Sequence, residues 1–129
     1  ETYRLELQNI PGIRLIEYDA TERCNYQYII IEVDEALSGI NRDELVRMLH
    51  AENVLARRYF YPGCHEMEPY RSYFPHAGLL LPQTECLTRR VMSLPTGTAV
   101  GKDEIAGVCA LIRLAIENSQ EFKSRLAML

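Results

Sequence analysis

The sequence predicts an α+β domain, with a small, largely antiparallel β-sheet and helices packed on one face. Strand-like segments come first along the chain and can pair locally, and helices with one apolar face follow them. The chain has 129 residues, of which 47% are hydrophobic and 25% charged, so it can form one domain with a modest core. We expect residues 1–129 to be one unit, and one apolar side of such a thin layer can be covered by another element.

The first part of the chain carries two strand signals after a short helix. Residues 1–9 have the pattern of a helix end, stopped by Pro11-Gly12. Residues 13–18 alternate weakly between apolar and polar side chains and predict a strand. Residues 25–33 give the strongest strand signal, because they are β-branched and aromatic and nearly all apolar after Gln27. Such a run suits a central strand that is buried on both faces for part of its length.

The next predicted element is a capped helix that begins at Asn41. This residue is a favourable N-cap, and Glu44 stands three positions later, as in a capping box. The apolar face of the helix consists of Leu45, Met48 and Leu49. The helix is expected to end near residues 52–53, and residues 54–59 then predict another strand.

The second half of the chain is mainly helical. One helix is predicted over residues 82–92, and residues 93–97 form a short extended stretch. The inward side chains of that helix are expected to be Cys86, Leu87 and Val91. The last long helix begins at Gly101, with acidic residues in its first turn, where the helix dipole favours them. Its apolar stripe consists of Ile105, Val108, Cys109, Ile112 and Ile116.

Composition and charge exclude several classes of protein. The net charge is −4 with acidic and basic residues interleaved, so the chain has no basic patch for nucleic acid. No apolar run approaches the length of a membrane span. The chain shows no signal peptide, and its four cysteines have no Cys-x-x-Cys spacing, so we expect reduced thiols in a cytoplasmic protein. It starts without Met, in what looks like a helix already under way, and we expect it to be part of a longer protein.

Residues 57–73 carry the strongest functional signal. They contain four of the eight tyrosines together with a histidine, a cysteine and arginines, in a segment too irregular for one helix or strand. Such side chains combine flat apolar surfaces with hydrogen-bonding ends, which suits rings, phosphates and sugar hydroxyls. The alternative is a buried connector whose tyrosines fill the core and whose Pro62-Gly63 makes a turn.

The pair Arg57-Arg58 is the best candidate for binding an anion, with ordinary ion pairs at a strand end as the alternative. The two side chains alternate along a strand, so at most one should point into a cleft. His65 is either a donor to a ligand or a side chain satisfied by the backbone. Asn25 and Tyr26 lie where a sheet edge could meet a ligand, or where a strand simply begins. No spacing of His, Asp, Glu and Cys matches a metal site, so none is expected.

Six short motifs, in this order, resemble a known family. They are Ile10-Pro11-Gly12-Ile13, Asn25-Tyr26-Gln27-Tyr28, Asn41-Arg42-Asp43-Glu44-Leu45, Arg57-Arg58-Tyr59-Phe60-Tyr61-Pro62-Gly63-Cys64-His65, Leu81-Pro82-Gln83-Thr84-Glu85 and Val91-Met92-Ser93-Leu94-Pro95. Together they are similar to the C-terminal small domain of the DegT/DnrJ/EryC1/StrS family. Its members are pyridoxal-phosphate sugar aminotransferases of the aspartate aminotransferase superfamily, fold type I. The resemblance covers essentially the whole chain.

The resemblance implies pyridoxal 5′-phosphate as the cofactor of the parent enzyme. In this family the cofactor domain lies N-terminal to this region. It supplies the aldimine lysine, the carboxylate that pairs with the pyridine nitrogen, and the phosphate-binding loop. The two lysines of this chain, Lys102 and Lys123, match no such motif. Because the lysine is indispensable, we expect this chain alone to bind no cofactor, to hold no catalytic residue and not to transaminate.

The resemblance also implies a reaction and its partners. An amino acid, typically glutamate, donates the amino group that reaches the keto group of a nucleotide-diphosphate deoxysugar, for deoxyamino-sugar biosynthesis. The enzymes are homodimers with shared sites, and the small domain helps to close the cleft. The residues implied to face the nucleotide sugar are Arg58, Tyr59, Tyr61 and His65. Asn25 and Tyr26 would lie near the cleft entrance.

Two alternatives stay open. One is a non-catalytic module that binds a nucleotide or a sugar with the same loop, and the other is a structural interaction domain with an aromatic core. The Gly63-Cys64 pair departs from commoner versions of the family's loop, which leaves the local geometry to be determined.

Overall fold

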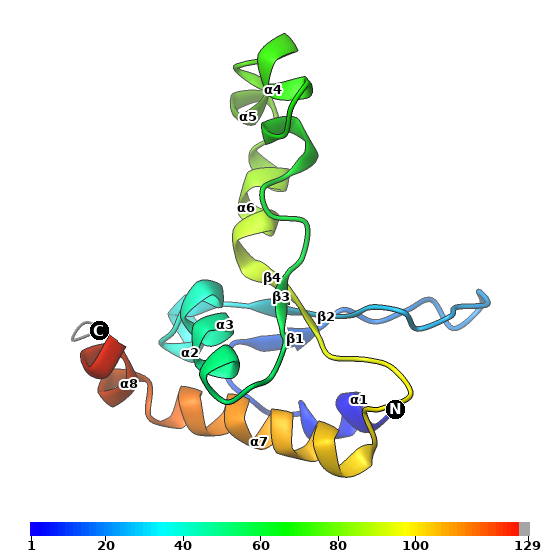
Figure 1. The fold of residues 1–129 in the computed structure, drawn as a ribbon, viewed down its shortest axis with the longest axis vertical. Coiled ribbons are helices and arrows are strands. Elements are labelled where there is room, and N and C mark those ends of the chain that lie inside the picture. The colour runs from blue at the N-terminus through cyan, green and yellow to red at the C-terminus, as the bar shows by residue number, and fades with distance from the viewer. Residues whose placement is uncertain (127–129) are drawn as a thin grey trace.

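A four-stranded antiparallel sheet is the centre of the structure, a computed structural model that describes residues 1–126 (Figure 1). Its strands are β1 (Ile13–Leu15), β2 (Ile29–Val33), β3 (Arg57–Arg58) and β4 (Val91–Leu94). Their order across the sheet is β1-β2-β4-β3, and every neighbouring pair is antiparallel. The predicted α+β class with a small antiparallel sheet is therefore confirmed.

The helices fall into two groups. The body of the domain holds α1 (Thr2–Glu6), α2 (Glu35–Ser38), α3 (Arg42–Ala51), α7 (Lys102–Glu117) and α8 (Ser119–Leu126). A separate group lies between β3 and β4 in the chain and consists of the 3₁₀ turn η1 (Cys64–Glu66), α4 (Tyr70–Tyr73), α5 (Ala77–Leu80) and α6 (Pro82–Arg90). None of the described helices combines the length and the apolar character that crossing a membrane requires.

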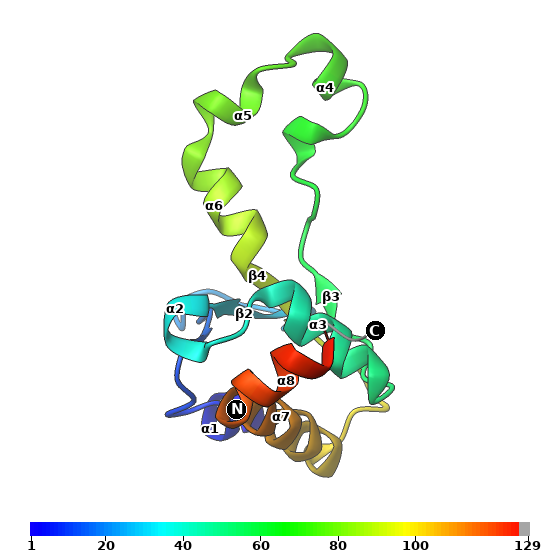
Figure 2. The same ribbon diagram turned by 90° about the vertical axis from the view of Figure 1, so that its left-hand side faces the viewer.

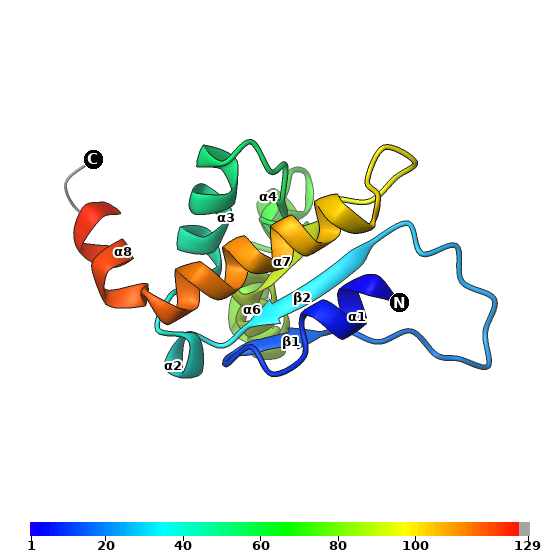
Figure 3. The same cartoon turned by 90° about the horizontal axis from the view of Figure 1, so that it is seen from below.

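Helices α1, α3 and α7 cover one face of the sheet and enclose the core (Figure 3). Ile31 of β2 and Met92 of β4 face each other across the sheet, and both are fully buried beneath these helices. The predicted stripe of α7 is confirmed, because Val108, Cys109, Ile112 and Ile116 are buried and Ile105 packs against them. Burial raises the pKa of the Cys109 thiol to about 11, as expected for a core cysteine.

The opposite face of the sheet is polar. Arg14 of β1 pairs with Glu32 of β2, whose side chain is buried there. Arg90, the last residue of α6, lies 3.3 Å from the Glu32 carboxylate and 3.1 Å from that of Asp34. These ion pairs fasten the end of α6 to the sheet, and helices pack only on the other face.

Helix α3 begins as the sequence predicts. The Asn41 side chain accepts a hydrogen bond from the Glu44 amide at 2.9 Å, and the Glu44 carboxylate accepts one from the Asn41 amide at 2.8 Å. This reciprocal capping box satisfies two amides that a helix start leaves without partners. Leu45 and Leu49 then point into the core and are fully buried.

Residues 59–90 leave the sheet as an arm (Figures 1 and 2). No residue of α4, α5 or α6 is buried. The most exposed apolar side chains of the arm are Phe60, Tyr73, Phe74, Leu79 and Leu80. The predicted inward orientation of Cys86 and Leu87 is wrong, since both are exposed on α6, which has no core to face. Val91 is buried, but it belongs to β4 and not to the helix.

Three predicted strands are longer than the observed ones. The strand expected over residues 13–18 is observed only over Ile13–Leu15. The strand expected over residues 25–33 begins only at Ile29, because Asn25 forms a side-chain turn with the amide of Gln27, and Tyr26 has a left-handed φ of 51°. Residues 16–28 instead extend beyond the sheet as a long loop (Figure 3). The strand expected over 54–59 is reduced to Arg57–Arg58, the two residues that pair with Ser93 and Met92.

Replacing a core residue of α7 tests this packing. Ile112 is 0% exposed, whereas Leu114 on the same helix is 58% exposed. We expect Ile112→Ala to lower the free energy of unfolding by about 3 kcal/mol, because it leaves a cavity in a dense core. Leu114→Ala is the matched control and should change it by less than about 0.5 kcal/mol. Urea unfolding measures both, and equal effects would contradict the assigned orientation of α7.

Candidate functional site

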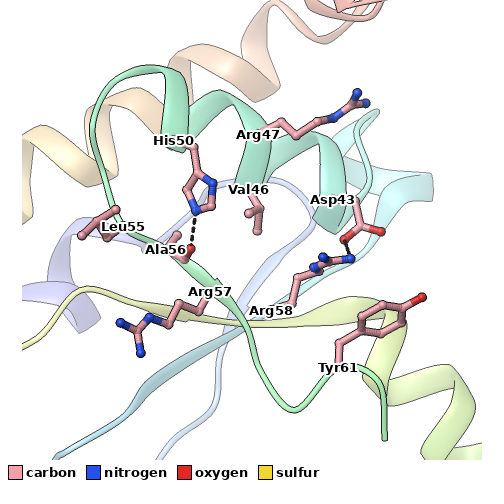
Figure 4. A pocket seen from close by; sticks show the side chains of 9 residues that line it. All are labelled: Asp43, Val46, Arg47, His50, Leu55, Ala56, Arg57, Arg58 and Tyr61. Atoms are coloured by element: carbon pink, nitrogen blue, oxygen red, sulfur yellow. Dashed lines mark hydrogen bonds and ion pairs between the residues drawn. The ribbon is translucent and has the colours of Figure 1, made fainter. Parts of the chain in front are cut away.

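The two arginines of β3 point to opposite faces of the sheet. Arg58 pairs with Met92, whose side chain faces the helices, and Arg57 pairs with Ser93 on the other face. Figure 4 shows Arg58 directed toward Asp43 of α3, with Arg57 turned away. The predicted alternation along the strand is confirmed, so Arg58 is the arginine that meets the helix layer.

A pocket of about 570 Å³ lies between α3 and β3 (Figure 4). The polar and aromatic residues that line it are Asp43, Arg47, His50, Arg57, Arg58 and Tyr61. The Arg58 guanidinium carbon lies 4.8 Å from the centre of the Tyr61 ring, a cation–π distance, and an Arg58 nitrogen lies 4.0 Å from the Asp43 carboxylate. The predicted residues Arg58 and Tyr61 therefore do meet, at the base of the arm.

Arg42 is a further member of this site that the sequence did not indicate. It is the first residue of α3 and is only 1% exposed. Its Nε donates to Asp43 Oδ1 at 2.8 Å, and its Nη1 donates to the carbonyl oxygen of Val91 at 2.6 Å. Its guanidinium carbon lies 5.2 Å from the centre of the same Tyr61 ring. Tyr61 is thus in contact with two cations, one exposed and one buried.

An aromatic patch lies beside the pocket and joins the long loop to the start of the arm. It consists of Tyr18, Tyr26, Tyr28, Tyr59 and Phe60. The ring centres are 5.2 Å apart for Tyr18 and Tyr26, 5.5 Å for Tyr28 and Tyr59, and 4.2 Å for Tyr59 and Phe60. Tyr26 and Phe60 are exposed although their backbones have positive φ values, an uncommon conformation for bulky side chains. The patch presents flat surfaces of the kind that stack on rings.

His65 forms a pair with Glu85 inside the arm. Its Nε2 lies 2.5 Å from the Glu85 carboxylate, which also lies 3.1 Å from Arg89. The hydrogen bond from His65 is the main reason that the pKa of Glu85 falls below its usual range, and Arg89 adds to the effect. Glu66 joins His65 and Glu85 in a group whose ligand atoms lie within 4.8 Å of one another. Since Glu85 is already paired twice, we keep the prediction that the chain binds no metal.

The six residues predicted to contact substrate thus lie in three places. Arg58 and Tyr61 share the pocket, Tyr26 and Tyr59 share the aromatic patch, and His65 lies in the arm with Glu85. Asn25 forms a turn next to the patch. Sequence reasoning missed Arg42, Tyr18, Tyr28 and Phe60. Their signal was weak, because each depends on a partner far away in the chain or on a backbone turn.

The sequence of this chain matches a known protein family. The model of the DegT/DnrJ/EryC1/StrS aminotransferase family matches residues 1–113. The chain belongs to this family. The motifs that suggested it, including the loop from Arg57 to His65, lie inside the matched region.

Individual members of the family are similar over most of this chain. A dTDP-4-amino-4,6-dideoxy-D-glucose transaminase of Escherichia coli is 28% identical over 110 residues, which cover 85% of this chain and 29% of that protein. A protein of the same name from Shigella dysenteriae is 39% identical over 70 residues, 53% of this chain and 18% of that protein. The chain therefore spans less than a third of the length of these curated relatives.

Solved structures of aminotransferases share the fold of this chain. DesI, crystallised in the presence of its TDP-sugar product, matches with a TM-score of 0.87 and 48% identity, over 98% of this chain and 31% of that one. The aminotransferase TlmJ from Streptoalloteichus hindustanus matches with a TM-score of 0.74 over 92% of this chain and 30% of that one. Its identity is 21%, so it supports the fold alone. The architecture of this chain, a small antiparallel sheet with helices, is therefore one found within fold type I aminotransferases.

The pair formed by His65 and Glu85 predicts a pH-dependent contribution to stability. A carboxyl with a lowered folded-state pKa stabilises the fold above its unfolded-state value of about 4.3, and this stabilisation is lost as the pH falls through the folded-state pKa. Glu85→Gln should therefore destabilise the chain near about pH 5.5, and the difference from wild type should shrink as the pH is lowered below about 4.3. Urea unfolding over a series of pH values in this range tests this. The control is Glu66→Gln, and a pH-independent effect of Glu85→Gln would argue against the pair.

Proposed function

We propose that this chain is the C-terminal small domain of a longer pyridoxal-phosphate-dependent aminotransferase. The parent enzyme would transfer an amino group from an amino acid, glutamate in our proposal, to a keto-deoxysugar carried by a nucleotide diphosphate. The observation that carries the proposal is the match to DesI, at 48% identity over 98% of this chain. DesI was crystallised with a TDP-sugar product, and deoxyamino-sugar biosynthesis is the corresponding role for this protein.

The residues of this chain do not fit the cofactor. Lys102 is exposed in the first turn of α7, and the Lys123 ammonium lies 3.2 Å from the Glu35 carboxylate and 4.0 Å from that of Glu44. A resting enzyme of this class needs a lysine beside the cofactor ring. Neither lysine has such surroundings, which supports the proposal that the cofactor, its lysine and the chemical steps belong to another part of the parent protein.

The role of this chain would be to contact the substrate. A nucleotide sugar carries a flat base, phosphates and sugar hydroxyls, and the predicted residues offer a partner for each. Tyr26 and Tyr59 offer stacking surfaces, Arg58 beside Tyr61 offers a cation, and His65 offers a ring nitrogen. Asn25 adds an amide beside Tyr26. These six residues would form the small-domain side of the cleft.

The assembly of the parent enzyme is also part of the proposal. Exposed Leu79, Leu80 and Phe74 give the arm an apolar surface that other parts of a larger assembly could cover. We propose a cytoplasmic homodimer with sites shared between subunits, as the family resemblance implies. The four cysteines are free thiols in the structure, which is compatible with a reducing compartment.

An absorbance experiment separates the parent from the fragment. The full-length protein, purified with pyridoxal phosphate, should show the visible band of a lysine-bound cofactor, and glutamate should abolish that band. The 129-residue chain, treated in the same way, should show no such band because it lacks the lysine. A folded full-length protein without bound cofactor would contradict the proposal and favour the non-catalytic binding module.

Substitution of Tyr59 tests the substrate contact. In the full-length enzyme, Tyr59→Ala should raise KM for the nucleotide sugar about 3- to 10-fold with little change in kcat, because stacking contributes about 1 kcal/mol. Tyr59→Phe keeps the ring and should retain the wild-type KM. Steady-state kinetics with varied nucleotide sugar measures both values. An unchanged KM in Tyr59→Ala would remove this residue from the cleft.

A further inference from the structure

One nitrogen of the buried Arg42 guanidinium has no hydrogen-bond partner. Nε and Nη1 donate to Asp43 and to the carbonyl of Val91, whereas Nη2 is buried and unpartnered within residues 1–126. An unsatisfied buried donor costs about 1–3 kcal/mol, and more when it is charged. The fold therefore keeps a cationic donor for which these residues provide no acceptor.

A second cavity, of about 630 Å³, lies against Arg42. It shares Asp43, Arg47 and Tyr61 with the pocket of Figure 4, so the two cavities meet at these residues. Arg42 and Arg47 lie five positions apart on α3, and Arg58 approaches Asp43 from β3. The guanidinium groups of Arg42 and Arg58 lie over the Tyr61 ring, and Arg47 lines both cavities.

The charges around these cavities are unevenly balanced. Arg89 and Arg90 pair with Glu85 and with Glu32 and Asp34, and Glu35 pairs with Lys123. Arg47 makes no ion pair in the described part of the chain, and Asp43 alone serves both Arg42 and Arg58. Even without Arg57, which also lines the pocket of Figure 4, the three cations and one carboxylate have a net charge of about +2. This charge matches a phosphoryl dianion better than a single carboxylate.

The Tyr61 ring controls access to Arg42. It is 44% exposed and lies over both guanidinium groups, at 5.2 Å from Arg42 and 4.8 Å from Arg58. Contacts of this kind contribute about 0.5–1 kcal/mol at exposed sites, so a modest interaction could displace the ring. Turning the ring outward would uncover the Arg42 guanidinium toward the cavity that Arg42, Arg47 and Tyr61 line together.

We propose that Arg42, Arg47 and Arg58 form a phosphate-binding site beneath the Tyr61 ring. Arg42 Nη2 would supply the buried donor, and Arg47 and Arg58 would neutralise the charge. The site goes beyond the proposed substrate contacts, because Arg42 and Arg47 are not among them. It stands on the geometry of α3 and β3 and would survive the failure of the aminotransferase proposal. The phosphate could be free or part of a nucleotide.

Nuclear magnetic resonance on the full 129-residue chain tests the site. Inorganic phosphate is added to ¹⁵N-labelled protein at constant ionic strength, and the Nε–Hε signals of the arginines are followed. Saturable shifts at Arg42, Arg47 and Arg58 are expected, with no comparable shift at Arg4 of α1, which lines neither cavity. Absence of a saturable shift at Arg42 would overturn the proposal.

Matched variants locate the anion. Arg47→Ala and Arg58→Ala should each weaken phosphate binding about 10-fold, the loss of one charge-assisted contact. Arg4→Ala removes the same charge from α1, at a residue that lines neither cavity, and should weaken phosphate binding less than about 2-fold. Arg47 and Arg58 are both exposed, so their variants should fold, and their ¹⁵N spectra verify this. Equal effects of Arg4→Ala and Arg58→Ala would contradict a defined site.

Two further experiments test the position of the Tyr61 ring and the source of the phosphate. Tyr61→Ala removes the ring and should bind phosphate at least as tightly as wild type, whereas a 10-fold loss would overturn the placement beneath the ring. Thymidine diphosphate is titrated in parallel. Tighter binding at the same arginines would identify a nucleotide as the source, and binding no tighter than inorganic phosphate would identify free phosphate.

Discussion

The buried guanidinium of Arg42 is the interaction on which the rest of this structure depends. Its bond to the Val91 carbonyl ties the start of α3 to the residue where α6 becomes β4, 49 positions further along the chain. The same side chain supports Tyr61, near the point where the arm leaves β3. One cation thus fixes a helix, a strand end and the base of the arm relative to one another. Its loss would remove the side-chain donor that the Val91 carbonyl accepts from and would leave Asp43 with Arg58 alone.

The sequence predicted the elements whose causes are local. The capping box needs only Asn41 and Glu44, and the α7 stripe needs only helical spacing, so both could be inferred without a structure. The lengths of the strands, in contrast, do not depend on local sequence alone. Arg57–Arg58 is short because β4 pairs with just these two residues, and no sequence pattern shows where a partner strand ends. The inward orientation expected for Leu87 failed because apolar content was taken to mean a core, and the arm has none.

The candidate site was predicted in composition but not in arrangement. Strand alternation placed Arg58 and Arg57 on opposite faces, and the structure agrees. An arginine at the first position of a helix is normally solvated, so the burial of Arg42 could not be foreseen before Val91 was known to lie beside it. The aromatic patch joins Tyr28 to Tyr59, which are far apart in the chain and meet only through the sheet. The family resemblance suggested the role proposed for these residues, and the structure shows their partners.

The arm leaves and returns through residues that are direct neighbours in the sheet, since Arg58 pairs with Met92. Everything between them can change in length or sequence without altering the register of the four strands, as in a loop carried by an antibody domain. The body of the domain is thereby a frame, and the arm is an exchangeable insert. Evolution could diversify ligand recognition by replacing the insert alone, and grafting an arm between related chains would be a practical way to alter selectivity while leaving the frame intact.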